Sequence, residues 1–134
     1  MGAEVDDRLA IRNVIAQLAH AADTGTVDDY VALLTDDVVW ELPGTPVARG
    51  ADAMAIGIEA RRAAGTVGPG SHTRHVVSTV EVHVDGDVAT SLAFWEFLRD
   101  CAASPKVSSV GMYRDTLRRT GRGWKVAHRV ISRG

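Results

Sequence analysis

Cysteine is nearly missing from this chain of 134 residues, because Cys101 stands alone and no disulfide can form within the sequence. A chain of this length buries roughly 65–70% of the surface that its unfolded state exposes, so it can fold without a covalent cross-link or a structural metal. Proteins of reducing compartments rarely contain disulfides. We therefore expect a cytoplasmic protein.

An excess of charge of one sign is also missing. The 15 basic and 17 acidic side chains leave a formal net charge of −2. A surface that follows the phosphates of a nucleic acid needs a clustered basic excess. The sequence therefore predicts no nucleic-acid partner.

Long apolar runs and cofactor motifs are absent as well. Nowhere do about eighteen apolar residues follow one another, so no membrane-spanning segment is expected. The acidic start, Met1 to Arg8, lacks the basic and apolar regions of a secretory signal. Glycine motifs for phosphates and dinucleotides, the Gly-x-Ser-x-Gly motif, and clusters of histidines and carboxylates with metal-ligand spacing do not occur. We expect neither a cofactor nor a metal ion.

The first part of the chain has the periodicity of helices. Apolar residues recur every three or four positions over residues 6–22, which predicts an amphipathic helix that ends at Asp23 to Gly25. Thr26 and Asp29 have the pattern of a capping box and start a short second helix, which we expect to end at residues 35–37. Residues 38–42 have the composition of a strand, and residues 50–64 the pattern of a third helix.

The second part has the alternation of strands. We expect strands over residues 73–84, 88–99, 107–119 and 124–132, with a hairpin turn at residues 85–87. Helices followed by a run of meandering strands predict an α+β fold, in which the helices cover the concave face of a curved, mainly antiparallel sheet. Residues 1–134 contain no internal repeat or long linker and are expected to form a single domain. Such a sheet leaves a cavity at its open end.

Two residues are the first candidates for chemistry. His75 lies near the start of the first long strand and is either a hydrogen-bonded core histidine or a general acid or base. Asp23 lies at the end of a helix, where the helix dipole disfavours negative charge. It is either a turn residue or a carboxylate with a compensating partner.

The neighbouring histidines are not expected to join His75. His72 precedes it by three positions, which on a strand puts the two rings on opposite faces and argues against a shared metal ion. If the strand stays regular, His83 lies on the same face as His75, but eight residues then separate the two by roughly 26 Å.

Four segments of the sequence together resemble a known family. They are Leu18-Ala-His-Ala-Ala-Asp23, Arg74-His75, Gly111-Met-Tyr-Arg-Asp-Thr-Leu117 and Gly123-Trp-Lys-Val-Ala-His-Arg129. The chain resembles, over nearly its whole length, the SnoaL-like members of the nuclear transport factor 2-like superfamily. The resemblance implies a cone-shaped α+β barrel, with three N-terminal helices packed on the sheet and a deep pocket for a small, mostly apolar molecule. It also implies that His75 faces this pocket as a general acid or base and that Asp23 pairs with it.

The resemblance suggests further site residues. Similar lyases place an acid or a histidine near Glu96, although the strand pattern alone makes Glu96 a solvent-facing residue. Arg129 would bind a carboxylate or an enolate in the pocket, unless it pairs with Asp115 or Glu96. The other residues expected to contact the substrate, each of which is also a plausible core residue, are Leu18, Trp40, Trp95, Met112 and Tyr113.

Leu18 is a departure from the family pattern. Many relatives that act as dehydratases carry a tyrosine five residues before the aspartate. Leu18 stands at that position and has no proton to donate to a substrate oxygen. This weakens a dehydratase assignment in particular.

The residues and the resemblance together predict an enzyme. We expect a cofactor-independent dehydratase, isomerase or cyclase that acts on an apolar carbonyl compound, steroid-like or polyketide-like, with His75, Asp23 and Glu96 as catalytic residues. The alternative is a non-catalytic ligand-binding or subunit-association module of the same fold. Similar proteins are usually homodimers through the exposed sheet face. A surplus of apolar strand residues fits such a dimer: Val82, Val84, Val88, Leu92, Leu98 and Val110.

Overall fold

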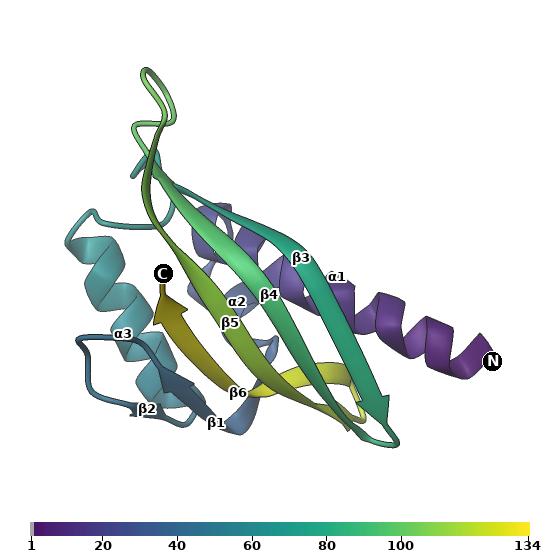
Figure 1. Ribbon diagram of the computed structural model, residues 1–134. Coiled ribbons are helices and arrows are strands. Elements are labelled where there is room, and N and C mark those ends of the chain that lie inside the picture. The colour runs from purple at the N-terminus through teal and green to yellow at the C-terminus, as the bar shows by residue number, and fades with distance from the viewer. Residues whose placement is uncertain (1) are drawn as a thin grey trace.

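The computed structural model describes residues 2–134, which form three helices and a six-stranded sheet (Figure 1). The helices are α1 (Gly2–Thr24), α2 (Val27–Val31) and α3 (Ala51–Ala63). The strands are β1 (Leu34–Glu41), β2 (Ala48–Arg49), β3 (Arg74–Asp85), β4 (Val88–Arg99), β5 (Lys106–Thr120) and β6 (Gly123–Arg133). The α+β fold expected from the sequence is confirmed.

The sheet is mixed but mainly antiparallel. Its strand order is β2-β1-β6-β5-β4-β3, and β1 runs parallel to β6 while the other neighbours are antiparallel. Helix α1 packs behind β3, and α3 lies beside β1 and β2 (Figure 1). We call the face that these helices cover the inner face and the opposite one the outer face.

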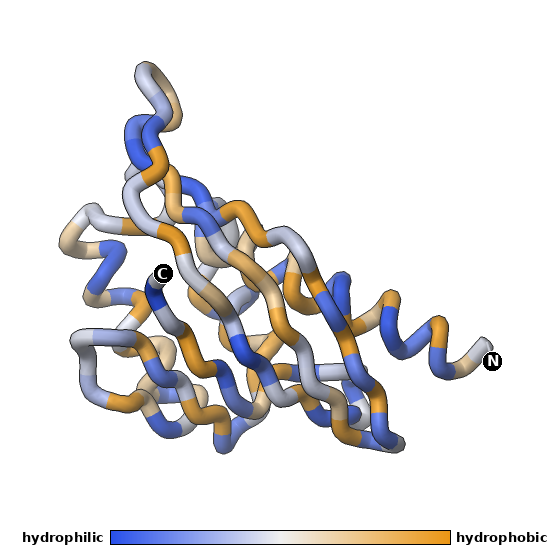
Figure 2. Tube along the Cα trace, in the orientation of Figure 1, coloured by the Kyte–Doolittle hydropathy of each residue, from blue (hydrophilic) through white to orange (hydrophobic). Residues whose placement is uncertain are grey.

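Alternation along the strands decides which side chains face the helices. In β4, Ala89, Ser91, Ala93 and Trp95 are buried on the inner face, while the residues between them point outward. Figure 2 shows the resulting change between apolar and polar residues along the strands. The apolar core lies between α1 and the inner face, and Leu18, which is 2% exposed, belongs to it.

A bulge at Thr79 reverses this alternation within β3. Thr79 has a φ of 54°, which is rare for a β-branched residue, and the pairing with β4 shifts between Ser78 and Glu81. His75 therefore faces inward before the bulge, whereas His83 lies on the outer face after it. The prediction that the two histidines share a face was wrong, because it assumed a regular strand.

The same bulge moves two valines that were expected to help cover the outer face. Val82 is buried in the core, and Val84 packs against the core. A hydrogen bond of 2.8 Å from Arg12 of α1 to the carbonyl of Val80 fixes the strand just after the bulge. The bulge thus bends β3 onto α1, so that its second half contributes to the core.

The early boundaries also differ from the prediction. Helix α2 ends at Val31, and β1 already begins at Leu34, where the sequence predicted continued helix up to residues 35–37. Leu34 pairs with Val126 of β6, and the N–H of Val126 donates to the carbonyl of Leu33 over 2.9 Å. Sheet pairing thus outweighs the local helical pattern. Within residues 2–134, no helix combines the length and the apolar composition that crossing a bilayer requires.

Candidate active site

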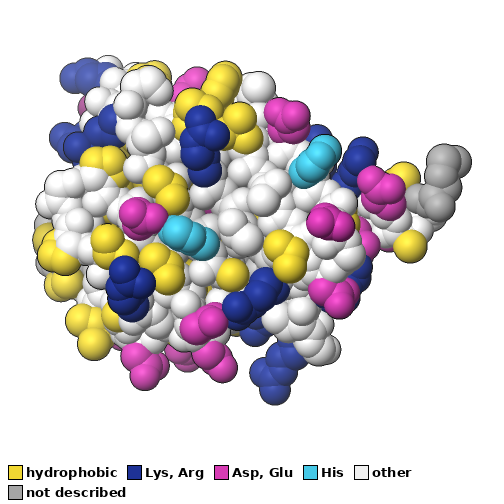
Figure 3. Space-filling view, turned by 60° about the horizontal axis from the view of Figure 1, so that its bottom comes forward, with side chains coloured by type: hydrophobic (Ala, Val, Ile, Leu, Met, Phe, Trp, Pro, Cys, Tyr) yellow, Lys and Arg dark blue, Asp and Glu magenta, His cyan; other side chains and the backbone are white. Residues whose placement is uncertain are grey.

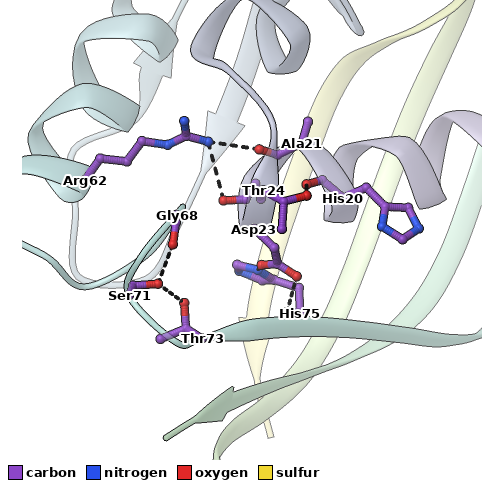
Figure 4. A network of polar contacts seen from close by, with 10 residues as sticks. His20, Ala21, Asp23, Thr24, Arg62, Gly68, Ser71, Thr73 and His75 are labelled. Atoms are coloured by element: carbon purple, nitrogen blue, oxygen red, sulfur yellow. Dashed lines mark hydrogen bonds and ion pairs between the residues drawn. The ribbon is translucent and has the colours of Figure 1, made fainter. Parts of the chain in front are cut away.

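Asp23 and His75 form a hydrogen-bonded pair between the end of α1 and the start of β3 (Figure 4). Asp23 Oδ1 lies 2.7 Å from His75 Nδ1, and Asp23 Oδ2 accepts the backbone N–H of His75 over 2.9 Å. The carboxylate is buried, and the imidazole is half-buried. One side chain therefore fixes both the ring and the backbone of its partner.

This geometry assigns the two ring nitrogens of His75. An ionised carboxylate can only accept hydrogen bonds, so Nδ1 carries the proton that points to Asp23. In the neutral ring Nε2 then holds the free lone pair. Such a couple presents one basic nitrogen and stabilises the imidazolium once that nitrogen takes a proton.

Arg62 explains how Asp23 can sit at the unfavourable end of a helix. The Arg62 side chain reaches from α3 and donates to the carbonyls of Ala21 and Gly25 over 2.9 and 2.8 Å (Figure 4). Both carbonyls lie at the C-terminal end of α1, where a cation is favourable, and that of Ala21 also accepts the N–H of Gly25 over 3.1 Å. The compensating charge expected for Asp23 is thus supplied by Arg62, 39 positions further along the chain.

The loop that leads into β3 is fixed from the other side. The Ser71 hydroxyl bonds to the carbonyl of Gly68 over 2.6 Å and to the Thr73 hydroxyl over 2.7 Å. Gly68 packs so closely on Arg62 that an added Cβ would lie 2.9 Å from that side chain. Figure 4 shows the end of α1, Arg62 and this loop around the Asp23–His75 pair. The pair is thus held between the end of α1 and residues 62–75, two segments that are distant in sequence.

His75 is part of the wall of a cavity of about 210 Å³ on the inner face. The aromatic and apolar walls come from α2, β1 and the inner rows of the sheet. They include Tyr30, Trp40, Trp95, Phe97, Tyr113 and Ile131. The His75 and Phe97 rings pack against each other, with centroids 4.9 Å apart.

The strand register brings the wall residues together. His75 pairs with Phe97, Trp95 with Gly111, and Tyr113 with Ile131, so successive inner rows of β3 to β6 face the same space. Gly111 makes room for the Trp95 ring, because a Cβ there would lie 2.7 Å from the indole and 1.8 Å from the carbonyl of Ser132. The small residue at position 111 is therefore a condition for the aromatic wall.

Three side chains of the cavity wall carry polar groups that have no hydrogen-bond partner within residues 2–134. The Trp95 indole N–H is buried and has no hydrogen-bond partner, which costs roughly 1–3 kcal/mol until an acceptor meets it. The hydroxyls of Tyr30 and Tyr113 take part in none of the hydrogen bonds of residues 2–134. Burial raises the pKa of Tyr30 to about 12, although Arg129 and Arg61 oppose the rise, and burial also raises the pKa of Tyr113. Both phenols are therefore protonated donors at neutral pH.

Arg129 supports the cavity from beneath. Its Nε and Nη2 donate to Asp115 over 2.7 and 2.8 Å, and its guanidinium lies 3.8 Å from the Tyr113 ring centroid and 4.9 Å from that of Trp40. Burial would lower the pKa of Arg129, but the Asp115 carboxylate raises it above its ordinary value. Of the two roles expected for Arg129, the structure shows the pairing with Asp115. Arg129 packs behind Trp40 and Tyr113 and is not itself a lining residue.

Besides Arg129, three more of the predicted residues do not line the cavity. Glu96 is exposed and Met112 half-buried on the outer face, because each occupies the outward position of its strand, and Met112 pairs with the outward Phe94. Leu18 packs in the core between α1 and the sheet. The expectation of Glu96 as a catalytic partner of His75 is therefore wrong. Trp40, Trp95 and Tyr113 line the cavity, and their contact with a substrate stays a prediction.

Sequence reasoning missed Tyr30, Arg61 and Arg133 as cavity residues. Tyr30 has the spacing of an ordinary apolar helix face, and Arg61 belongs to a pair of arginines typical of a solvated helix end. Only the packing of α2 and α3 against the sheet shows that they reach the same space. No three histidine, cysteine or carboxylate side chains of residues 2–134 come together as a metal site would require.

The fold places this chain in a known class of proteins, and comparison with known families and structures identifies its family. The class is the nuclear transport factor 2-like, cystatin-like fold, in which helices pack on a curved sheet around an inner cavity. The chain belongs to the SnoaL-like domain family, whose model matches residues 3–130. No curated protein sequence matches the chain.

Several solved structures are similar to this one. A nuclear transport factor 2-like protein from Novosphingobium aromaticivorans is 28% identical, with a TM-score of 0.83 over 95% of this chain and 81% of the other. A candidate aromatic ring hydroxylase from the same organism is 25% identical, with a TM-score of 0.79 over 96% and 90%. A candidate scytalone dehydratase, also from this organism, is 18% identical, with a TM-score of 0.78 over 98% and 86%.

Proposed function

We propose that this protein is an enzyme of the lyase, isomerase or cyclase type, which moves a proton on a small carbonyl compound bound in the inner cavity. The observation that carries the proposal is the Asp23–His75 hydrogen bond of 2.7 Å at the cavity wall. The couple supplies a base with a defined tautomer, and the aromatic walls supply a dry place for an apolar substrate.

The chemistry follows from the positions of the donors. His75 Nε2 takes the proton from the carbon next to the carbonyl, the C–H electron pair forms an enolate, and the phenols or the Trp95 N–H donate to the enolate oxygen. In an isomerisation the imidazolium returns the proton to another carbon. In a dehydration the C–O bond to a β-hydroxyl breaks, and this hydroxyl leaves as water with the proton from His75.

The size of the cavity bears on the substrate. A volume of about 210 Å³ lies below the roughly 300–1,000 Å³ of most ligand pockets. This favours a compound with one or two rings over a four-ring steroid. Tyr30 and Tyr113 supply the acidic protons that Leu18 lacks, so the departure from the family pattern at position 18 does not leave the cavity without a donor.

The alternative is a ligand-binding or subunit-association module without turnover. Leu18 in the core and Glu96 on the outer face favour it, since two residues expected in the active site are elsewhere. The hydrogen bond between Asp23 and His75 favours the enzyme. A binding module needs apolar walls, whereas a carboxylate that both fixes the tautomer and stabilises the imidazolium suits a group that exchanges protons.

The test is a screen of small enolisable ketones and β-hydroxy ketones for proton exchange in deuterated water, followed by NMR. We expect turnover to fall about 10²- to 10⁴-fold in His75→Ala, which is the usual contribution of general acid–base catalysis. Asp23→Asn should also reduce kcat, because the amide disturbs the ring orientation and no longer stabilises the imidazolium. His83→Ala, on the outer face of the same strand, is the matched control and should leave turnover unchanged. Undiminished activity of His75→Ala would exclude the proposed role of this residue.

We also propose that two copies of the chain associate through the outer face. Val76, Phe94 and Val110 are 39–46% exposed there, on neighbouring strands that no helix of residues 2–134 covers. Figure 3 shows a face of the molecule on which apolar, acidic, basic and histidine side chains are interspersed. A surface that carries both signs of charge around apolar groups can pair with a second copy of itself across a two-fold axis.

A further inference from the structure

The two arginines that line the inner cavity have no carboxylate beside them in its lining. Arg61 from α3 and Arg133 from β6 line it, and its lining contains no aspartate or glutamate. Asp23 lies behind His75, where its carboxylate is occupied by that residue. Arg61 is half-buried and Arg133 is exposed, so both guanidinium groups are accessible to a ligand that enters from solvent.

Neither arginine is neutralised within the part of the chain that the structure describes. The ion pairs of residues 2–134 involve Arg8, Arg118, Arg119 and Arg129, and neither Arg61 nor Arg133 donates a side-chain hydrogen bond. Arg133 pairs in the sheet with Gly111 and shares its inward direction with Ile131. The positive charge of Arg61 acts on the buried Tyr30, whose pKa it lowers against the effect of burial.

Two cations that line one small cavity repel each other, and an anion between them removes the repulsion. The guanidinium fork binds carboxylates and phosphates with two parallel hydrogen bonds. A planar carboxylate with one charge suits a cavity walled by Trp40, Trp95 and Phe97. A dianionic phosphate would lose more hydration energy against these apolar walls.

We propose that the natural ligand is a small aromatic or otherwise unsaturated carboxylic acid, whose ring lies among the aromatic walls and whose carboxylate is bound by Arg61 and Arg133. The proposal deepens the function proposed above, since it names the substrate class of the same site. A carboxylate held by the two arginines would fix the ligand along the cavity, so that its reacting carbon meets His75 in one orientation.

The experiment compares trans-cinnamate with trans-cinnamamide by isothermal titration calorimetry. The two probes have nearly the same shape and differ in charge, and neither is a substrate for proton transfer next to a ketone. We expect cinnamate to bind about tenfold more tightly than the amide to the wild type at low salt. The advantage should shrink as the salt concentration rises. Arg61→Gln and Arg133→Gln should each reduce the advantage, and the double variant should abolish it.

Arg122→Gln is the matched control, because it removes the same charge from an exposed turn between β5 and β6. It should leave the preference for cinnamate intact. Equal binding of the two probes, binding of neither, or a preference that survives in the double variant would overturn the proposal. These results are independent of turnover. Turnover of neutral ketones without any preference for acids would support the proposed proton transfer and exclude recognition of a carboxylic acid. Binding of the acid without turnover of any ketone would support acid recognition and count against the proposed proton transfer.

Discussion

At the scale of single residues, the ionisation of the two tyrosines can be used to test how the cavity is built. The chain has only two, Tyr30 and Tyr113, and both line it. Burial raises the pKa of each, that of Tyr30 to about 12. Since no tyrosine lies elsewhere in the sequence, every tyrosine signal comes from the proposed active site.

The folded protein should therefore resist tyrosine ionisation. In a titration followed by tyrosinate absorbance near 295 nm, we expect less ionisation at pH 10 in the folded than in the unfolded state and, for Tyr30, a midpoint near pH 12 in the folded state. Below pH 10 both the folded and the unfolded state keep the Tyr30 proton. Between pH 10 and 12 only the unfolded state loses it, so the free energy of unfolding falls by roughly 2–3 kcal/mol as the pH rises.

The variant Tyr30→Phe isolates this effect. It removes the ionisable group but keeps the ring, so the loss of stability above pH 10 should become shallower in urea denaturation at several pH values. Stability at pH 7 should change little, because the Tyr30 hydroxyl makes no hydrogen bond within residues 2–134. Tyrosinate absorbance that already develops around pH 10 in the folded wild type would contradict the buried placement of the phenols.

At the scale of elements, the site depends on how the ends of α1 and α3 meet. Arg62 near the end of α3 donates to two carbonyls at the end of α1, one turn from Asp23. Its Nε is buried without a partner, so the side chain is held in place by these bonds and by the close packing of Gly68. Arg62 is therefore a positioning residue for the Asp23–His75 pair.

Arg62→Gln should lower the free energy of unfolding by about 2 kcal/mol, because two charge-assisted hydrogen bonds to a helix end are lost. Urea denaturation measures this loss. If Arg62 had only a structural role, this loss of stability would be the only effect of the substitution. As a positioning residue, Arg62 should also protect the His75 Nδ1 proton, whose NMR signal should exchange faster with water in the variant. Arg62→Lys should restore this protection in part, and Arg122→Gln should change neither measurement. An unchanged exchange rate of the Nδ1 proton in Arg62→Gln would show that Arg62 contributes to stability but does not position His75.

The elements themselves were largely predictable from the sequence. The helical and two-residue periods gave all three helices and the four long strands, because they record which side of each element faces the core. The bulge at Thr79 was not predictable, since it arises from pairing between β3 and β4 and from the contact of α1 with Val80. The Asp23–His75 pair came from the family resemblance. The role of Arg62 was not predictable from the sequence, because its partners are backbone carbonyls at the end of another helix.

At the scale of the whole molecule, the sheet separates two surfaces with different features. The inner face holds the cavity with its arginines and aromatic walls, and the outer face carries a shallow groove of about 440 Å³ that includes Glu81, His83, Arg114 and His128. The outer face also bears the pair of His128 and Glu41, 2.6 Å apart. Because a single layer of sheet divides them, association on the outer face leaves the proposed active site open.

Association should therefore be separable from ligand binding. By size-exclusion chromatography with light scattering, we expect the wild type to be a dimer at micromolar concentration, since a stable interface needs roughly 800 Å² per partner and the outer face spans four long strands. Phe94→Gln, which removes the most exposed of the three apolar side chains named for this face, should shift the protein to monomer without lowering its melting temperature or its affinity for cinnamate. Ile56→Gln removes an apolar side chain from α3 that is even more exposed, 70% against 46% for Phe94, and should leave the dimer intact. A wild type that is monomeric at tens of micromolar would contradict the proposed dimer. A dimer that survives Phe94→Gln but not Ile56→Gln would show that the interface lies elsewhere.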